Sequence, residues 1–204
     1  MQSLVRFLVI VVVISSLSIT QSRGEEAKRS DSAERPLLKV ALLQMLLGDG
    51  VTSRLQWNVC ERRALAYSID VIYEPLVDTG VLDIEAAVAP ESLVDLVREV
   101  VSALRSVVER GPTDAELERT HQRYRLALEF ALDSPTTLSL YHHSALVCPL
   151  QTIDERLATL PGWSRKRLQA LARRVLSRAG LALVSVGPAR RTALRTVERV
   201  VAQL

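Results

Sequence analysis

The chain has 204 residues, of which 48% are apolar and 24% charged, so it can bury a hydrophobic core and has the composition of an ordinary globular domain. Only 4% of the residues are aromatic, and leucine, valine and alanine must therefore fill that core. The net charge of +3 is unevenly spread, because residues 165–204 carry ten basic residues and one acid, a net of +9.

We interpret this basic end as helices with solvated arginine faces. Attraction to acidic peptide, lipid head groups or nucleic acid is the alternative. Aromatic residues are missing from it apart from Trp163 at its edge, which argues against nucleic acid as a partner.

The chain begins with a segment typical of a secretory signal peptide. A single basic residue precedes an unbroken apolar run at residues 7–14, and the small residues Thr20 and Ser22 fit a cleavage site. The apolar stretch is short for a membrane span, which needs about 20 residues. We therefore predict a signal peptide over residues 1–24 and an exported protein, periplasmic or secreted. An uncleaved membrane anchor is the alternative.

Residues 25–35 are polar, lack apolar periodicity and are predicted to form a flexible spacer, so the folded domain is expected to span residues 36–204. Two cysteines, Cys60 and Cys148, would meet an oxidising compartment after export, where a disulfide can form. Their spacing carries no signal for a bridge, and both a disulfide and two buried free thiols stay open.

The periodicity of the remaining chain predicts helices mixed with a few strands. A first helix begins at Pro36 and ends at Gly48, and a capping box of Thr113 and Glu116 opens a later one. The other predicted elements, in chain order, are a helix at 53–63, strands at 66–73 and 81–88, helices at 90–109, 136–147, 154–160 and 164–176, a buried strand at 181–186 and a final helix at 190–202.

This order predicts an α+β fold, with helices packed on an antiparallel sheet. The strands at 66–73 and 81–88 are expected to pair with each other, because Pro75 and Gly80 mark a turn between them.

Several motifs resemble the pitrilysin/insulinase-type zinc metallopeptidases, the inverzincins that include bacterial processing-peptidase-like proteins. Residues 46–73 are similar to the segment "L-G-x-G-x-S-S-R-L…R-E-x-x-G-L-A-Y-S" of the non-catalytic half of these enzymes. Residues 113–119 look like the helix start "I-T-x-E-E-L-E-R", and residues 181–188 like a closing strand that ends in V-G-P. A helix at 165–176 sits where the family places one, so the likeness covers about residues 37–188 in the right order.

The resemblance implies one half-domain of the processing-peptidase fold. In this family one half carries the zinc motif and the other helps to hold the substrate, and this chain looks like the second half alone. The family's half-domain opens with a strand before the helix at Pro36, and here the signal and spacer take that place. We therefore expect the first strand to be missing, which would leave a sheet edge unpaired.

The catalytic motif of the family, His-x-x-Glu-His, is absent from the sequence. The three histidines are His121, His142 and His143, and none has the required neighbours. Glu118 and His121 share a helix face, but one such pair is not a metal site, and we expect all three histidines at surface positions. We therefore predict no catalytic residue, no metal ligand and no cofactor in this chain, with zinc only in a catalytic partner.

The family also carries an arginine and a tyrosine, seven positions apart, that reach toward the bound peptide. Tyr67 matches the tyrosine, whereas Cys60 stands at the arginine position and Ala64 at a family glycine. A thiol has neither the fixed charge nor the forked donors of a guanidinium. Arg62 and Arg63 lie nearby and are the candidate substitutes, although a helix would point them to different sides. The candidate substrate-binding residues are thus Tyr67, Arg63 and Arg62, with core packing as the alternative role of Tyr67.

Three functions follow from this comparison. The first is a non-catalytic, exported half-domain that assists a zinc-bearing, pitrilysin-like partner subunit in enclosing peptide substrates. The second is a stand-alone binding or structural domain, or a remnant, that has lost its peptidase context. The third, an enzyme in its own right, has no support beyond the family, because no G-x-S-x-G elbow is present and a cysteine–histidine pair cannot be identified from sequence alone.

Overall fold

A computed structural model of the chain describes residues 8–14, 36–75, 80–139, 152–177 and 180–204. Its sheet has four antiparallel strands in the order β2-β3-β1-β4. The strands are β1 (Leu8–Ile14), β2 (Ala66–Pro75), β3 (Gly80–Val88) and β4 (Leu181–Ser185). The predicted antiparallel pairing of the two middle segments is confirmed, with Val71 opposite Ile84.

The expectation that the first strand is missing is wrong. Leu8–Ile14 forms β1, which pairs with β3 along seven residues and with β4 along five. A strand with neighbours on both sides can hydrogen-bond its backbone along both edges, and a continuous apolar, β-branched run suits such a position. The same residues were assigned to the apolar part of the signal peptide. Residues 15–35, which include the predicted cleavage site and the spacer, lie outside the described part of the chain.

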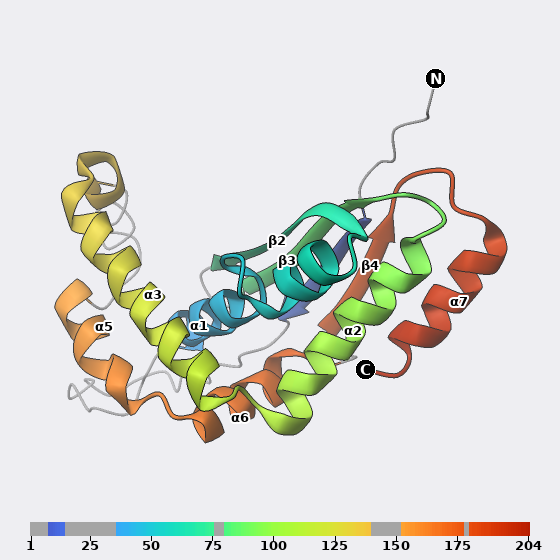
Figure 1. Cartoon of the computed structure of the whole chain (residues 1–204). Coiled ribbons are helices and arrows are strands. Elements are labelled where there is room, and N and C mark those ends of the chain that lie inside the picture. Colours follow the sequence, from blue (N-terminus) through green and yellow to red (C-terminus); the bar gives the residue numbers. More distant parts are fainter. Residues whose placement is uncertain (1–7, 15–35, 76–79, 140–151, 178–179) are drawn as a thin grey trace, which may run out of the picture.

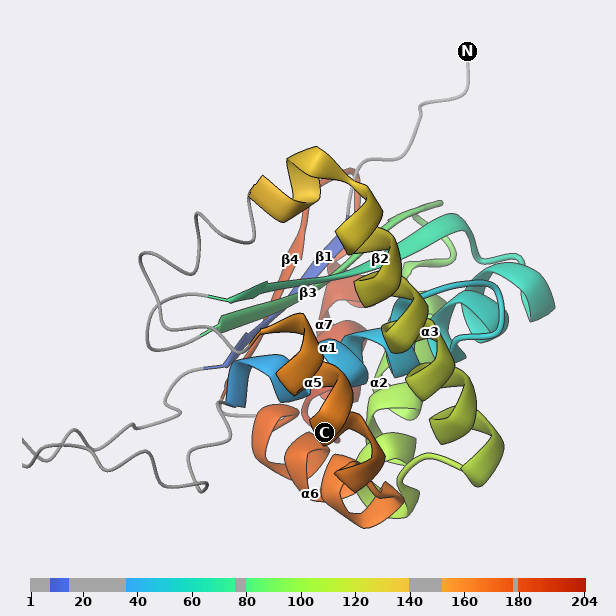
Figure 2. The ribbon, with the colours of Figure 1, turned by 90° about the vertical axis from the view of Figure 1, so that its left-hand side faces the viewer.

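The helices lie mainly on one side of the sheet (Figures 1 and 2). They are α1 (Pro36–Gly48), α2 (Leu93–Arg110), α3 (Asp114–Asp133), α5 (Ile153–Thr159), α6 (Arg165–Val175) and α7 (Arg191–Val201), with a short π-helix η1 (Gln56–Arg62) and a 3-10 turn η2 (Leu160–Gly162). Residues 135–139 are also helical, and the rest of the helix expected at 136–147 lies outside the described residues. The predicted α+β fold, with helices on an antiparallel sheet, is confirmed.

The core lies between the sheet and these helices and consists mostly of leucine and valine. In β3 alternate residues such as Leu82 and Ile84 are buried, while Asp83 and Glu85 between them are partly exposed. Helix α1 contributes Leu43 and Leu47, which are both fully buried. The scarcity of aromatic residues therefore has the predicted consequence for the interior.

Gly48 allows α1 to approach β2 closely. A Cβ atom at this position would lie 2.1 Å from the Cγ2 atom of Val71, which no side chain could tolerate without movement. In the same region Gln44 donates a hydrogen bond to the Val71 carbonyl at 2.9 Å. Gly50, two residues further on, has a φ of +81°, which glycine adopts at little cost. It packs against the guanidinium of Arg123.

Three further expectations can be compared with the structure. The helix expected at 53–63 is largely the π-helix η1. The strand β4 was expected to be buried, but it is an edge strand of the described sheet, and its Val184 is 48% exposed. The arginines of α6 and α7 are exposed, which confirms the solvated faces. None of the described helices is long and apolar enough to span a membrane.

Candidate functional site

The junction of η1 and β2 carries all three predicted substrate-binding residues. The π-helix ends at Arg62, and a tight turn then leads into β2. The turn is closed by two backbone hydrogen bonds, from the amide of Ala64 to the Cys60 carbonyl at 3.1 Å and from the amide of Leu65 to the Val59 carbonyl at 2.9 Å. We call residues 60–67 the junction segment.

Tyr67 is 98% exposed, so its side chain does not pack in the core. It lies at the beginning of β2, where the pairing with β3 is interrupted between Ala66 and Ile69 by a bulge or irregularity. Such irregularities re-aim side chains and are common beside functional sites. Of the two roles considered from sequence, packing is therefore wrong, and contact with a bound molecule stays a prediction.

Arg62 and Arg63 both bind the carboxylate of Glu99 on α2. The Arg62 guanidinium lies 3.6 Å from one Glu99 oxygen, and Arg63 forms a shorter ion pair with the other. The side chain of Glu99 is only 15% exposed, whereas those of Arg62 and Arg63 are 58% and 39% exposed. The two arginines were expected on different sides of a helix. The π-helix and the turn that follows it instead bring both to one acid, and this clamp ties the junction segment to α2.

Cys60 is half-buried and packs against the hydrophobic core. Burial raises the pKa of its thiol, and the negative charges of Glu61 and Asp70 raise it further. A thiol with a raised pKa is protonated at neutral pH and is a poor nucleophile. Cys148 lies outside the described residues, so the structure does not address a disulfide between the two cysteines.

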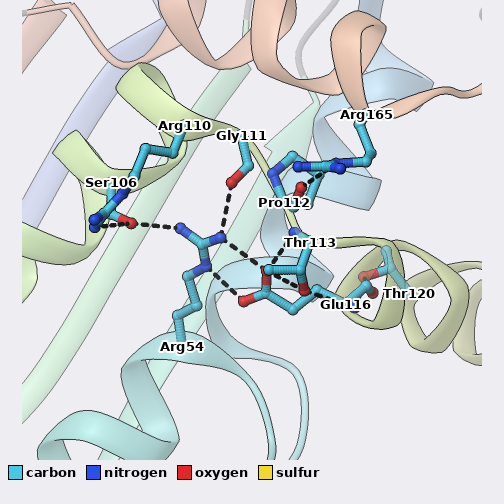
Figure 3. A network of polar contacts seen from close by, with 9 residues as sticks. All are labelled: Arg54, Ser106, Arg110, Gly111, Pro112, Thr113, Glu116, Thr120 and Arg165. Atoms are coloured by element: carbon cyan, nitrogen blue, oxygen red, sulfur yellow. Dashed lines mark hydrogen bonds and ion pairs between the residues drawn. The ribbon is translucent and has the colours of Figure 1, made fainter.

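Arg54 binds more polar partners than any other residue near the junction segment, and the sequence analysis did not single it out. Its guanidinium holds the Glu116 carboxylate with two hydrogen bonds of 2.7 and 2.8 Å, and also donates to the Ser106 hydroxyl and the Gly111 carbonyl, each at 2.9 Å (Figure 3). The Arg54 side chain is 13% exposed. The contact joins the start of the η1 segment to the end of α2 and the beginning of α3.

Glu116 also completes the predicted capping box of α3. The Thr113 amide donates to its carboxylate at 2.7 Å, while the Glu116 amide donates to the Thr113 hydroxyl at 3.2 Å. Partial burial acts to raise the pKa of Glu116, but the hydrogen bonds and charge of Arg54, with the hydrogen bonds of Thr113, outweigh it and lower the pKa to about 2. The pair is thus ionised at neutral pH.

Helix α6 is attached to the same turn. Arg165 donates from Nε to the Pro112 carbonyl at 2.6 Å (Figure 3). Its guanidinium also lies 3.3 Å from the Asp114 carboxylate. The turn between α2 and α3 is therefore held by arginines from two sides, one from the η1 region and one from α6. A motif search along the sequence could not have found these contacts, because Arg54 and Glu116 are 62 positions apart.

His121 is half-buried on α3, so its expected surface position is wrong. Its Nε2 atom is buried and has no hydrogen-bond partner among the described residues. Burial lowers its pKa most, against an opposing effect of Glu118. His142 and His143 lie outside the described residues. The described part of the chain contains no group of three or more His, Cys, Asp or Glu residues placed to hold a metal ion.

Chemically, the junction segment offers hydrogen-bond donors to a bound molecule. The exposed phenol of Tyr67 can donate to a peptide carbonyl, and the Arg62 and Arg63 guanidiniums carry positive charge beside it in sequence. Because Glu99 already binds both arginines, the phenol is the most available of these groups.

A family model described as "Peptidase M16 inactive domain" matches residues 15–124 of the chain. An uncharacterized zinc protease of Mycobacterium tuberculosis (strain ATCC 25618 / H37Rv) is 33% identical over 141 residues, which are 68% of this chain and 32% of that protein. An uncharacterized zinc protease of Bacillus subtilis (strain 168) is 27% identical over 147 residues, or 71% of this chain and 36% of that protein. The chain thus spans about a third of the length of the curated relatives that it matches.

Solved structures share the fold. A protease from Helicobacter pylori superposes with a TM-score of 0.73 and 18% identity, covering 91% of this chain and 42% of that one. A peptidase M16 inactive domain from Pseudomonas fluorescens has a TM-score of 0.68 and 19% identity, covering 90% and 41%. An inactive peptidase domain from Bordetella parapertussis, with a TM-score of 0.69 and 14% identity, is covered over 98% of its length by 94% of this chain.

Proposed function

This chain belongs to the peptidase M16 inactive-domain family, and from that premise we propose that it assists a zinc-bearing partner in enclosing peptide substrates. The resemblance to the pitrilysin-type metallopeptidases is confirmed, and the chain is a non-catalytic half-domain of this family. Its relatives in mycobacteria and bacilli are named zinc proteases and are about three times as long as the region they share with it. This sequence lacks His-x-x-Glu-His, so the zinc in our proposal belongs to the partner.

The exposure of Tyr67 is the observation that carries the substrate role. A tyrosine that is 98% exposed loses apolar contacts that a buried ring would gain, so its position is better explained by a contact with another molecule than by stability. The segment that carries it is fixed on both sides, by Arg54 with Glu116 before it and by Arg63 with Glu99 at its turn. Because the backbone of this segment is held in place, the entropy lost when the phenol binds a peptide carbonyl is mainly that of the Tyr67 side chain.

Export is part of the proposal on sequence grounds alone. Residues 1–24 have the charge, apolar run and small residues of a secretory signal. The same apolar run supplies β1, so cleavage after Ser22 would remove the strand that lies between β3 and β4. The mass of the mature protein decides between the two uses of this segment, since a chain that starts after Ser22 was exported and processed.

Reconstitution with a zinc-bearing partner tests the proposed function. We would mix the purified chain with a pitrilysin-like subunit that carries His-x-x-Glu-His and follow hydrolysis of an unstructured peptide. We expect no hydrolysis by the chain alone and faster hydrolysis by the mixture than by the partner alone. Tyr67→Phe should raise KM about fivefold, the effect of one lost hydrogen bond of about 1 kcal/mol.

Tyr73→Phe is the matched control, because Tyr73 lies on the same strand but its hydroxyl is buried. Its KM in the mixture should equal that of the wild type. If the chain neither binds the partner nor accelerates hydrolysis, the result favours the alternative, a stand-alone binding or structural domain. The binding of both junction arginines to Glu99, with Cys60 in place of the family arginine, is the observation that favours this alternative.

A further inference from the structure

A cavity of about 810 Å³ opens beside the Arg54 network and is distinct from the junction segment. Among the described residues, four arginines line it, Arg54, Arg110, Arg119 and Arg165, together with a single carboxylate, that of Glu116. Because Glu116 is held by Arg54, these two charges largely cancel. Arg165 pairs with Asp114, so Arg110 and Arg119 are the charges that make the cavity electropositive.

Two of these arginines are free to bind a ligand. Arg110 contacts only the hydroxyl of Ser106 among the described residues, at 2.9 Å, and Arg119 has no ion-pair partner among them. Both side chains belong to exposed residues on the cavity wall, at the end of α2 and on α3. Guanidinium groups match carboxylates with two parallel hydrogen bonds, so a pair of them in one cavity favours an anionic group.

A buried hydroxyl lies beside the cavity. Ser53 lines the same cavity and is only 5% exposed, yet its Oγ atom has no hydrogen-bond partner among the described residues. An unsatisfied buried hydroxyl costs free energy unless something binds it. The Oγ atom has almost no accessible surface, so a ligand oxygen in the cavity would reach it only after a change of the Ser53 rotamer.

Trp57 gives the cavity an apolar side. It lines the same space and is 51% exposed, which is unusual for the largest apolar side chain. Asn58 beside it adds an amide that can pair with a peptide backbone. The cavity thus combines an aromatic wall, an amide and uncompensated arginines. This combination fits a peptide with acidic side chains better than an inorganic anion, which would make no apolar contact with the tryptophan.

We infer that this cavity binds a carboxylate-bearing segment of a peptide, with Arg110 and Arg119 as the groups that recognise the acid. That the ligand is a peptide rests on the proposed function, whereas its negative charge follows from the cavity. The site gives the chain a preference for acidic segments, which the family assignment alone does not supply.

Titration of the full chain with a capped hexapeptide of alternating glutamate and alanine tests this inference without any partner subunit. Trp57 is a built-in reporter, because the other tryptophan, Trp163, is 8% exposed. We expect the tryptophan fluorescence to change on binding, Trp57→Phe to abolish that change, and the affinity to fall with added salt. The glutamine version of the peptide should not bind measurably.

The decisive variant is Arg110→Gln with Arg119→Gln, which should weaken binding of the glutamate peptide by about tenfold or more. Arg191→Gln with Arg195→Gln is the matched control, since it removes two exposed arginines from α7, outside the cavity. Urea unfolding of both double variants shows that each is folded.

Equal binding of the two peptides, or equal losses in the two double variants, would overturn the inference. So would inorganic phosphate that displaces the peptide at equal concentration, because the site would then be a general anion site. Failure of the reconstitution experiment alone leaves this result unaffected, so the two proposals can fail separately.

Discussion

Ala64 adopts a backbone conformation that glycine tolerates far better. Its φ is +47°, in the left-handed region, and no other described residue besides glycine has a positive φ. The family resemblance places a glycine at this position. The turn from η1 into β2 explains why, since it requires one residue in the left-handed backbone conformation. A β-carbon in this region costs about 1–2 kcal/mol.

Ala64→Gly should therefore stabilise the protein. We expect the free energy of unfolding to rise by about 1 kcal/mol, because relief of the strain exceeds the extra entropy of glycine in the unfolded chain. Urea denaturation measures this change. Ala66→Gly, two positions further on and within β2, is the control and should destabilise. A loss of stability in Ala64→Gly would show that the turn carries no strain.

The ion pair of Arg54 and Glu116 predicts a pH dependence. The folded pKa of Glu116 is about 2, below its ordinary value of 4.5. A depressed pKa contributes stability that is fully present above pH 4.5 and is lost as the pH falls toward 2, and a difference of this size corresponds to about 3 kcal/mol. Glu116→Gln should therefore lower the free energy of unfolding at pH 7 by about 3 kcal/mol.

The difference between wild type and Glu116→Gln should shrink as the pH is lowered from 5 to 2, in urea denaturation at each pH. Glu118→Gln is the control, because Glu118 is an exposed residue of the same helix and binds only Gln122 among the described residues. A difference that stays constant with pH would contradict the role given to the Glu116 charge.

At this scale the sequence predicted local contacts and missed distant ones. The capping box of Thr113 and Glu116 was recognised because its two residues are three positions apart. The same Glu116 binds Arg54 from a distant segment, and no spacing rule points to such a pair. Likewise, the meeting of Arg62 and Arg63 at Glu99 depends on a π-helix, which local periodicity does not distinguish from an α-helix.

Among the elements, β1 is the strand that the sequence analysis expected to be missing. Its residues, LVIVVVI, form a continuous apolar run, and both a signal peptide and a strand with neighbours on both sides use such a run. The helices and the β2–β3 pair were predicted because helical periodicity and strand alternation are local. The exposed edge of β4 was missed because its sequence does not say where in the sheet it lies.

A truncated chain tests the contribution of β1. A chain that begins at Glu25 lacks this strand, so β3 and β4 lose the neighbour that both pair with. We expect it to lose cooperative thermal unfolding and native near-ultraviolet circular dichroism. A chain that begins at Phe7 keeps the strand and should unfold at the temperature of the full-length protein.

Cooperative unfolding of the shorter chain at the full-length temperature would contradict the place of β1 in the sheet. It would also be compatible with removal of residues 1–24 during export. The comparison of the two truncations thus separates a structural segment from a removable one.

At the scale of the whole molecule, the chain is a non-catalytic half-domain of a peptidase family and presents two separate sets of groups to other molecules. One is the exposed Tyr67 on the junction segment, and the other is the electropositive cavity beside Trp57. Helix α2 takes part in both, through Glu99 at the first and Arg110 at the second. Because one helix borders both sets of groups, we propose that a single extended peptide contacts Tyr67 and the cavity together.

The chain's association with a zinc-bearing subunit is the central claim, and purification from the native source tests it most directly. We would isolate the protein under non-denaturing conditions, identify its companions by mass spectrometry and measure zinc in the same fraction. Our account predicts a stoichiometric companion that carries His-x-x-Glu-His, with zinc in the complex. A chain that purifies alone and free of zinc would contradict it.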